Sequence, residues 1–449
     1  MSVDEPPSSA GGAPEKSGRS SWPVVAIAGA VGGGVAPQLP SRLGASQFPP
    51  PGAALGADPA TPPAGPPPAL ALLTAPPHPS REGPDVLEMG ERAGVGAFQR
   101  AARSDNTLAA YRADWGRFTA WCARHGVPPL PAAPAVVAAY VAEAANTTAA
   151  SGRSVPWRYS PATLARWVAT INKAHDLAGE RPPGRDATVR DTLAGIRRRR
   201  ATPPKRKTPL LLADLGHLVA AVPVEGWPTA PGGLRNRCLL VMGWVGAFRR
   251  SELTNLTVDD VTLHPEDGLH VLIRVSKTDP EAQGRTYALP YARQALLCAP
   301  CAWLRWRQVI DASDGTDGGP GGRAGVMRAT RALQVDTHVC RNSQPAVPAV
   351  GEEPRSLFRA VKANGALGGP IDGHAITAVV KAAAAACGFD PARIGGHSLR
   401  AGFVTQAFRS GADAHSIMRQ TGHADPKTLE IYARESAPLV GNAVTLVGL

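Results

Sequence analysis

Apolar residues recur every three or four positions through four stretches between residues 104 and 200, which predicts four short amphipathic helices. Each stretch is bounded by residues that start or stop helices. Gly126 ends the first helix, and Ser160-Pro161 starts the third with a capping residue followed by proline. The predicted helices cover 104–126 and 135–145, begin at Ser160, and begin after the cap Asp186.

The second half of the chain mixes helical and strand patterns. A helix over 236–245 is apolar on all sides, which predicts a buried element that ends at Gly246. Residues 261–290 alternate in the manner of strands, with a turn at 279–284. Further helices are predicted over 302–312, 371–386 and from His397. The fold class is therefore mostly α with a small antiparallel β-sheet.

Composition divides the chain into four segments. Residues 1–95 hold 19 of the 45 prolines, which predicts a disordered tail rich in Pro, Gly and Ala. A helical domain over 96–200, a basic linker over 201–209 and a second domain over 210–449 follow. Within the last domain, 313–351 is rich in Gly, Pro and Arg with few apolar residues, and it is interpreted as an inserted mobile loop without a derivable role.

The positive charge is concentrated in one segment. The net charge is +12, and residues 100–207 alone hold 19 Lys+Arg against 7 Asp+Glu. Such a footprint favours a nucleic-acid partner, because basic side chains release counterions from phosphates. A solvated charge run between domains is the alternative. The candidate DNA-binding residues are Arg197, Arg198, Arg199, Arg200, Lys205, Arg206 and Lys207.

The six cysteines are scattered, so no disulfide framework is expected and a reducing interior fits. Cys298 and Cys301 form a single C-x-x-C pair. A zinc site needs a second ligand pair, and no Cys/His pair with zinc-site spacing lies near, so two idle thiols and no metal are expected. No run of about 18 apolar residues is present, which predicts no membrane span, and a secretory signal is not expected.

Four reactive side chains lie within 36 positions near the carboxyl end. His397 and Arg400 are three apart and share a helix face. His423 follows the predicted end of a second short helix at Gly422, and Tyr432 lies on a third helix that starts at Asp425-Pro426. A phenol beside cations is a candidate nucleophile, and arginine offers paired donors for phosphate oxygens. The electrophile that suits this set is a phosphodiester.

The order His-x-x-Arg, Gly-His and then Tyr resembles the carboxyl-terminal half of tyrosine recombinases, the phage integrase family. Phe248-Arg249-Arg250-Ser251-Glu252-Leu253 resembles the first arginine box of that family, which makes Arg249 the catalytic arginine and Arg250 the variable position. Ser276-Lys277-Thr278 resembles its lysine hairpin. The four helices before residue 200 resemble its core-binding (SAM-like) domain, and the rest its mixed α+β catalytic domain.

This resemblance implies a site-specific recombinase or integrase that cuts and rejoins DNA through a 3′-phosphotyrosine link. The implied catalytic residues are Arg249, Lys277, His397, Arg400, His423 and the nucleophile Tyr432. The implied enzyme needs no metal or other cofactor, and no P-loop motif points to ATP. Its partner would be double-stranded DNA, bound by a homotetramer on two duplexes in the cytoplasm. The alternatives are a topoisomerase that reseals one strand, an inactive DNA-binding descendant and a helical scaffold with a basic face.

Overall fold

The computed structural model describes residues 104–148, 157–200, 206–276, 279, 283–333, 335–341, 354–436, 439, 444 and 447. Contacts divide the chain into two compact units, Met1–Arg200 and Ala201–Leu449, and each is described by itself. The tail predicted over 1–95 lies outside the described residues. No helix in the described part of the chain is both long and apolar enough to cross a membrane.

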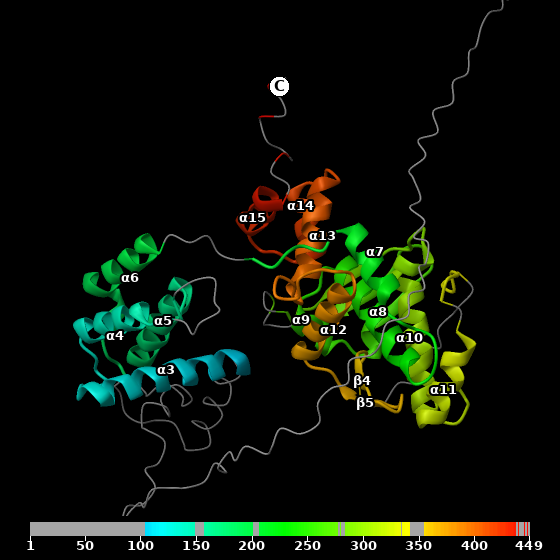
Figure 1. Cartoon of the computed structure of the whole chain (residues 1–449), viewed down its shortest axis with the longest axis horizontal. Coiled ribbons are helices and arrows are strands. Elements are labelled where there is room, and N and C mark those ends of the chain that lie inside the picture. Colours follow the sequence, from blue (N-terminus) through cyan, green and yellow to red (C-terminus); the bar gives the residue numbers. More distant parts are fainter. Residues whose placement is uncertain are drawn as a thin grey trace, which may run out of the picture. The chain divides into compact units, whose positions relative to one another are not determined.

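The described part of the first unit forms a bundle of four α-helices (Figure 1). The side chains of Ser104 and Ser160 each accept a backbone N–H three residues further on, and Asp186 caps the last helix. Gly126 ends the first helix in the left-handed conformation. The predicted starts and stops are therefore confirmed. The helices are α3 (Asp105–His125), α4 (Pro134–Asn146), α5 (Pro161–Leu177) and α6 (Ala187–Arg199), with a 3₁₀ turn η1 (Pro183–Arg185) before α6.

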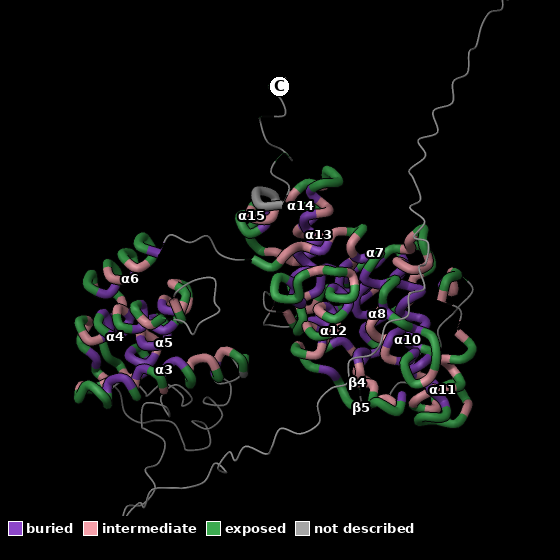
Figure 2. Tube along the Cα trace, viewed as in Figure 1, coloured by how far each residue is buried: buried purple, intermediate pink, exposed green. Residues whose placement is uncertain are grey.

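The second unit is mixed, and its buried residues concentrate on α8 and α10 (Figure 2). Eleven residues of α8 are buried, which matches the all-apolar pattern that predicted this helix. The α-helices are α7 (Leu212–Ala221), α8 (Thr229–Val245), α9 (Arg250–Asn255), α10 (Ala299–Asp314), α11 (Gly322–Ala332), α12 (Gly373–Ala386), α13 (His397–Arg409), α14 (Ala414–Thr421) and α15 (Pro426–Ser436). Two 3₁₀ turns, η2 (Val258–Asp260) and η3 (Ala295–Leu297), complete the helical elements of this unit.

Two small antiparallel sheets accompany these helices. The predicted strands form a three-stranded sheet in the order β1 (Val261–His264), β2 (Gly268–Ile273) and β3 (Arg285–Leu289). A second sheet pairs β4 (Arg359–Val361) with β5 (Leu367–Pro370). This second sheet was not predicted, because strands of three and four residues are too short to show an alternating pattern.

Segment 313–351 differs from the predicted loop, because residues 322–332 within it form α11. Only Gly325 and Val326 of this helix are buried. A Cβ at Gly325 would lie 2.0 Å from the carbonyl oxygen of Ala312, so α11 approaches the end of α10 closely. A helix that buries only two residues needs few apolar side chains, which is why the sequence of this segment suggested a loop.

Candidate active site

Helices α13, α14 and α15 pack against one another (Figure 1), and together they hold Tyr432. Val404 and Phe408 of α13, Ile417 of α14 and Leu429 of α15 form a small buried cluster, and Tyr432 packs against it. Asp413 caps α14 by accepting two backbone N–H groups, and Gly422 ends that helix with φ 66°. This small core fixes the direction in which the Tyr432 hydroxyl points.

Helix α13 is also held by a close backbone contact with the segment before α7. A Cβ at Gly402 would lie 1.6 Å from the carbonyl oxygen of Leu210, so only glycine permits this approach. The backbone N–H of Leu210 donates to the carbonyl of Ser398 over 3.1 Å, and its carbonyl accepts from the Trp244 indole over 2.7 Å. The amino-terminal turn of α13, which holds His397 and Arg400, is therefore anchored to the core.

The Tyr432 hydroxyl lies 2.6 Å from His397 Nε2. Burial lowers the pKa of His397, and the positive charges of Arg400, Arg249 and Arg250 lower it further. His397 is therefore neutral at neutral pH, and in the tautomer that has its proton on Nδ1 the Nε2 atom accepts from the phenol. The pair has the geometry of a nucleophile and its general base.

Arg400 lies at the centre of the site and is only 2% exposed. Its Nη1 donates to the carbonyl of Ala247 over 2.7 Å, and its Nη2 donates to His423 Nε2 over 3.2 Å. Burial lowers the pKa of Arg400 to about 10, and the neighbouring Arg249 contributes in the same direction. The guanidinium remains charged at neutral pH, and a bound anion would offset both the burial and the repulsion.

His423 is held in one tautomer by its neighbours. Arg400 can only donate, so His423 Nε2 accepts and Nδ1 holds the proton. Nδ1 then donates over 2.7 Å to the Thr421 hydroxyl, which gives its own proton to the carbonyl of Ile417 over 2.8 Å. Burial and the charges of Arg400 and Arg249 lower the pKa of His423 to about 3, which keeps the ring neutral.

Arg249, rather than its neighbour Arg250, points into this site. Arg249 Nη1 forms a 2.6 Å ion pair with Glu252, which is 3% exposed, and Arg249 Nη2 lies 3.5 Å from the carbonyl oxygen of Gly422. Glu252 also accepts the backbone N–H of Arg249 over 2.7 Å. Arg250 instead donates to the hydroxyl of the half-buried Thr377. The register that makes Arg249 the inward residue agrees with this geometry.

The turn before Arg249 has an unusual backbone. Ala247 has φ 49°, the only positive φ of a non-glycine residue among those described. This left-handed conformation costs an alanine about 1–2 kcal/mol. The same residue supplies the carbonyl that holds Arg400, so the strain lies where the two arginines are brought together.

Two residues of the site were missed by sequence reasoning. Thr421 is 1% exposed and orients His423, yet a single threonine at a helix end has no distinguishing pattern. Tyr287 of β3 is 6% exposed, and the charges of Arg249, Arg400 and Glu252 act on its hydroxyl. It lies in the stretch predicted to form strands, and that pattern gives no sign of a role in the site.

The remaining predicted residues either fall outside the described residues or belong to the basic segments 197–200 and 206–207. Lys277 and Lys205 are outside the described residues. Arg197, Arg198 and Arg199 are exposed in the last turn of α6, and Arg206 and Lys207 are exposed at the start of the second unit. Lys207 Nζ donates to the carbonyl of Ala392 over 2.6 Å.

Arg200 differs from the other residues predicted to bind DNA. It is 9% exposed, donates to the carbonyl of Tyr159 over 2.6 Å and lies 4.6 Å from the ring centre of Trp157. These contacts give Arg200 a packing role in the first unit, and we remove it from the residues proposed to contact DNA.

Comparison with known proteins identifies the family to which this chain belongs. The phage integrase family matches residues 341–437. An integrase/recombinase XerD homolog of Selenomonas ruminantium is 30% identical over 363 residues, which cover 80% of this chain and 90% of that protein. Tyrosine recombinase XerD of Xanthomonas axonopodis pv. citri (strain 306) is 25% identical over 280 residues, 62% of this chain and 74% of that protein.

Among solved structures, the XerH site-specific recombinase in a post-cleavage complex with palindromic difH substrate aligns with a TM-score of 0.49 and 13% identity, over 79% of this chain and 84% of that one. The Tn1549 transposon integrase with transposon right end DNA aligns with a TM-score of 0.44 and 16% identity, over 75% and 91% of the two chains. From the 30% identity that extends over 90% of the Selenomonas protein, the chain belongs to the phage integrase family of tyrosine recombinases.

Proposed function

We propose that this recombinase breaks and rejoins DNA strands with Tyr432 as the nucleophile. The observation that supports this most directly is the 2.6 Å contact between the Tyr432 hydroxyl and His397 Nε2, beside the two guanidinium groups of Arg249 and Arg400. A phenol next to a neutral base, with fixed cations nearby, suits attack on a phosphodiester.

In the cleavage step, the Tyr432 oxygen forms a bond to the scissile phosphorus and the bond from phosphorus to the 5′ oxygen breaks. The phenol proton goes to Nε2 of His397, in the tautomer that leaves this nitrogen unprotonated, because it lies 2.6 Å from the hydroxyl. Lys277 gives a proton to the departing 5′ oxygen, as the family resemblance implies. Attack by a 5′ hydroxyl of another strand then reverses these steps and releases Tyr432.

Arg249 and Arg400 are proposed to bind the non-bridging oxygens. A guanidinium has five N–H groups, and the hydrogen bonds found among the described residues use two on Arg400 and two on Arg249. Because both groups are held before DNA arrives, little reorganisation is needed when charge develops on the phosphate. These cations and donors supply the electrostatic stabilisation, and for that reason we propose a reaction independent of metal and ATP.

His423 is proposed to act mainly on Arg400. In this structure its Nε2 accepts from Arg400, so a direct hydrogen bond from His423 to a phosphate would require that contact to break. The catalytic role that the family resemblance implies for His423 is therefore refined to one in which it positions Arg400.

The exposed arginines at the end of α6 and the basic residues of the linker are proposed to lie along DNA phosphates. Arg197, Arg198 and Arg199 are exposed, and no ion pair involving them is found among the described residues. Such contacts position a duplex without reading its sequence. The enzyme is proposed to act on double-stranded DNA in the cytoplasm.

Recombination joins two duplexes, so we propose a homotetramer. Leu439 and Val447, which follow α15, are 62% and 65% exposed. Apolar side chains so exposed favour docking on a neighbouring copy, and a head-to-tail ring would close such an assembly. Deletion of the residues after 436 is expected to spare cleavage and to reduce synapsis, measured by sedimentation on DNA.

The test of the nucleophile uses a suicide DNA substrate that loses a short fragment on cleavage. The wild-type chain is expected to form a covalent complex, Tyr432→Phe to form none, and Tyr291→Phe to behave as wild type. Tyr291 is the matched control because its hydroxyl donates to the carbonyl of His264, away from this site. A covalent complex with Tyr432→Phe would refute the assignment.

Relaxation of a plasmid without a recombination site would favour the topoisomerase alternative. DNA binding without any covalent complex by the wild-type chain would favour an inactive descendant or a helical scaffold.

A further inference from the structure

Four side chains with metal-binding atoms meet beside α10, and none of them is among the residues proposed for strand transfer. Cys298, Cys301, His338 and Cys340 each offer one ligand atom, and these atoms all lie within 4.8 Å of one another. The sequence-based expectation that no second ligand pair lies near Cys298 and Cys301 is therefore wrong. The second pair is His338-x-Cys340, which lies 37 residues or more along the chain and approaches through the tertiary fold.

Three of the six distances between the four ligand atoms match the edges of a tetrahedron around one zinc ion, and all six are within 4.8 Å. With Zn–S of about 2.3 Å and Zn–N of about 2.0–2.1 Å, neighbouring sulfurs should be about 3.8 Å apart and a sulfur and a nitrogen about 3.6 Å apart. Cys298 Sγ and Cys340 Sγ are 3.8 Å apart. His338 Nδ1 lies 3.4 Å from Cys301 Sγ and 3.7 Å from Cys340 Sγ.

The histidine presents the correct nitrogen. His338 Nε2 lies 3.1 Å from the carbonyl oxygen of Arg293, which can only accept, so Nε2 holds the proton. Nδ1 then has a lone pair and faces the sulfurs. A ligating histidine that donates its other N–H to a backbone carbonyl is the usual outer-shell arrangement of a protein metal site.

The sulfurs are shielded from water and unbonded to one another. Cys298 and Cys301 are fully buried and Cys340 is 4% exposed, and all three are free thiols. The 3.8 Å between Cys298 and Cys340 is far longer than the about 2 Å of a disulfide. With four protein ligands the coordination sphere is closed, which is typical of a structural rather than a catalytic zinc ion.

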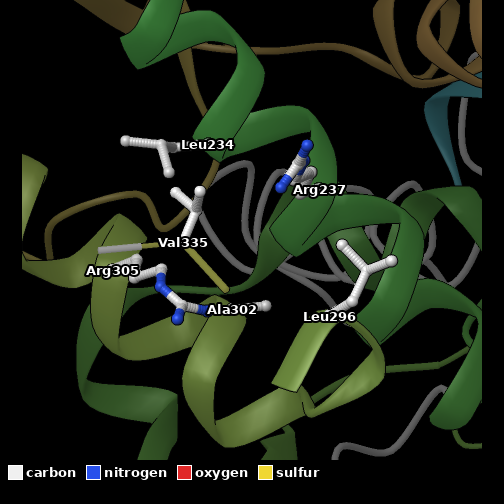
Figure 3. Close-up of a pocket in the computed structure, with 6 residues that line it drawn as sticks. All are labelled: Leu234, Arg237, Leu296, Ala302, Arg305 and Val335. Carbon is white, nitrogen blue, oxygen red and sulfur yellow. The ribbon is translucent and has the colours of Figure 1, made fainter. Parts of the chain in front are cut away.

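The first ligand pair lies at the start of helix α10, and the second pair lies in the segment that follows α11. Cys298 is the amino-terminal cap residue of α10 and Cys301 lies in its first turn, whereas His338 and Cys340 follow α11. Val335, just before this second pair, lines a small pocket with Arg305 of α10 and Leu234 of α8 (Figure 3). Arg305 also donates to the carbonyl of Thr337. The segment just before His338 is therefore tied to α10 and the core.

The surroundings also suit the charge of the complex. Three thiolates, one neutral imidazole and Zn²⁺ carry a net charge of −1. Arg305 is 5% exposed and lies close enough to interact electrostatically with Cys298, Cys301 and Cys340. A buried cation beside a buried anionic complex offsets the cost of removing each charge from water.

We propose that Cys298, Cys301, His338 and Cys340 bind one Zn²⁺ ion, which fastens the segment after α11 to the start of α10. On binding, each thiol gives a proton to solvent and its sulfur forms a bond to zinc, and no oxidation is involved. The site stabilises the fold of the second unit and is independent of the proposed strand transfer.

A second group of metal-binding side chains does not meet the same conditions. His264 ends β1, Asp267 is exposed in the turn that follows, and His270 lies in β2. His264 Nδ1 already accepts the backbone N–H groups of Glu266 and Asp267 over 3.3 and 3.1 Å. We therefore propose no metal site at this hairpin, and we use His270 as a control position for the metal measurements.

The first measurement is the metal content of the full-length chain, purified without added chelator and with any affinity tag removed. We expect about one zinc ion per chain, as a closed four-ligand site requires. Cys301→Ser and Cys340→Ser should lose it, whereas Cys387→Ser, a half-buried cysteine outside the cluster, and His270→Gln should retain it.

The second measurement needs no variant. Replacement of zinc by Co²⁺ in the wild-type chain should give the intense visible bands of tetrahedral cobalt together with a thiolate charge-transfer band. The proposal is overturned if the wild-type chain holds no zinc and gives no such spectrum, if the ion is lost in His270→Gln but kept in Cys301→Ser, or if mass spectrometry finds a disulfide between Cys298 and Cys340.

Discussion

Replacement of Thr421 by valine should test how the site orients Arg400. Valine has nearly the same shape but lacks the hydroxyl that accepts from His423 Nδ1 and donates to the carbonyl of Ile417. His423 would then have either an unsatisfied Nδ1–H or the other tautomer, whose Nε2–H would face the donor Nη2 of Arg400. Both outcomes weaken the hold on the guanidinium.

The magnitude follows from the bonds that are lost. A buried donor without a partner costs about 1–3 kcal/mol. If the same free energy is lost from the transition state through misplacement of Arg400, cleavage slows about 5- to 150-fold, because about 1.4 kcal/mol corresponds to tenfold in rate. The binding of uncleaved DNA should change less than the rate, since Arg400 keeps its charge and its bond to Ala247.

The assay is single-turnover formation of the covalent complex on a suicide substrate, with DNA affinity measured separately. Thr421→Ser keeps the hydroxyl and should restore most of the rate. Thr405→Val is the matched control, because Thr405 is also fully buried and its hydroxyl has no hydrogen-bond partner among the described residues. If Thr421→Val cleaves as fast as Thr405→Val, the proposed role of the tautomer is wrong.

Further predictions concern packing, charge and pH. Gly402→Ala should destabilise the second unit by several kcal/mol, because its Cβ would lie 1.6 Å from a backbone oxygen. In the control Gly216→Ala, the new Cβ in α7 would meet nothing within 4 Å, and this variant should stabilise the second unit by about 0.5–1 kcal/mol. Unfolding in denaturant measures both changes. Glutamine at positions 197–199 should flatten the slope of log affinity against log salt by up to about 2.7, while Arg200→Gln should instead lower the stability of the first unit. The pKa of His423 is about 6.5 in the unfolded chain and about 3 in the folded chain, so between these pH values only the unfolded chain binds the proton. As the pH is lowered from 6.5 to 3, the free energy of unfolding should therefore fall by up to about 1.4 kcal/mol per pH unit. His423→Gln should remove this part of the slope, and an unchanged slope would contradict the assignment.

The sequence alone determined most of the local structure. Helix starts at Ser104, Ser160 and Asp186 follow from short-range hydrogen bonds between a cap and the next turn, so neighbouring residues suffice to predict them. The shared face of His397 and Arg400 follows from helical geometry in the same way. These features depend on contacts over three or four positions, which a linear pattern contains.

The tertiary structure decided which distant residues meet. It turned Arg249 rather than Arg250 toward Gly422, fixed the tautomer of His423 through Thr421, and packed Arg200 against Trp157. It also brought the pair at 338 and 340 to Cys298 and Cys301 across two helices. Each of these contacts depends on the packing of elements far apart in the chain, and no spacing in the sequence encodes such a distance.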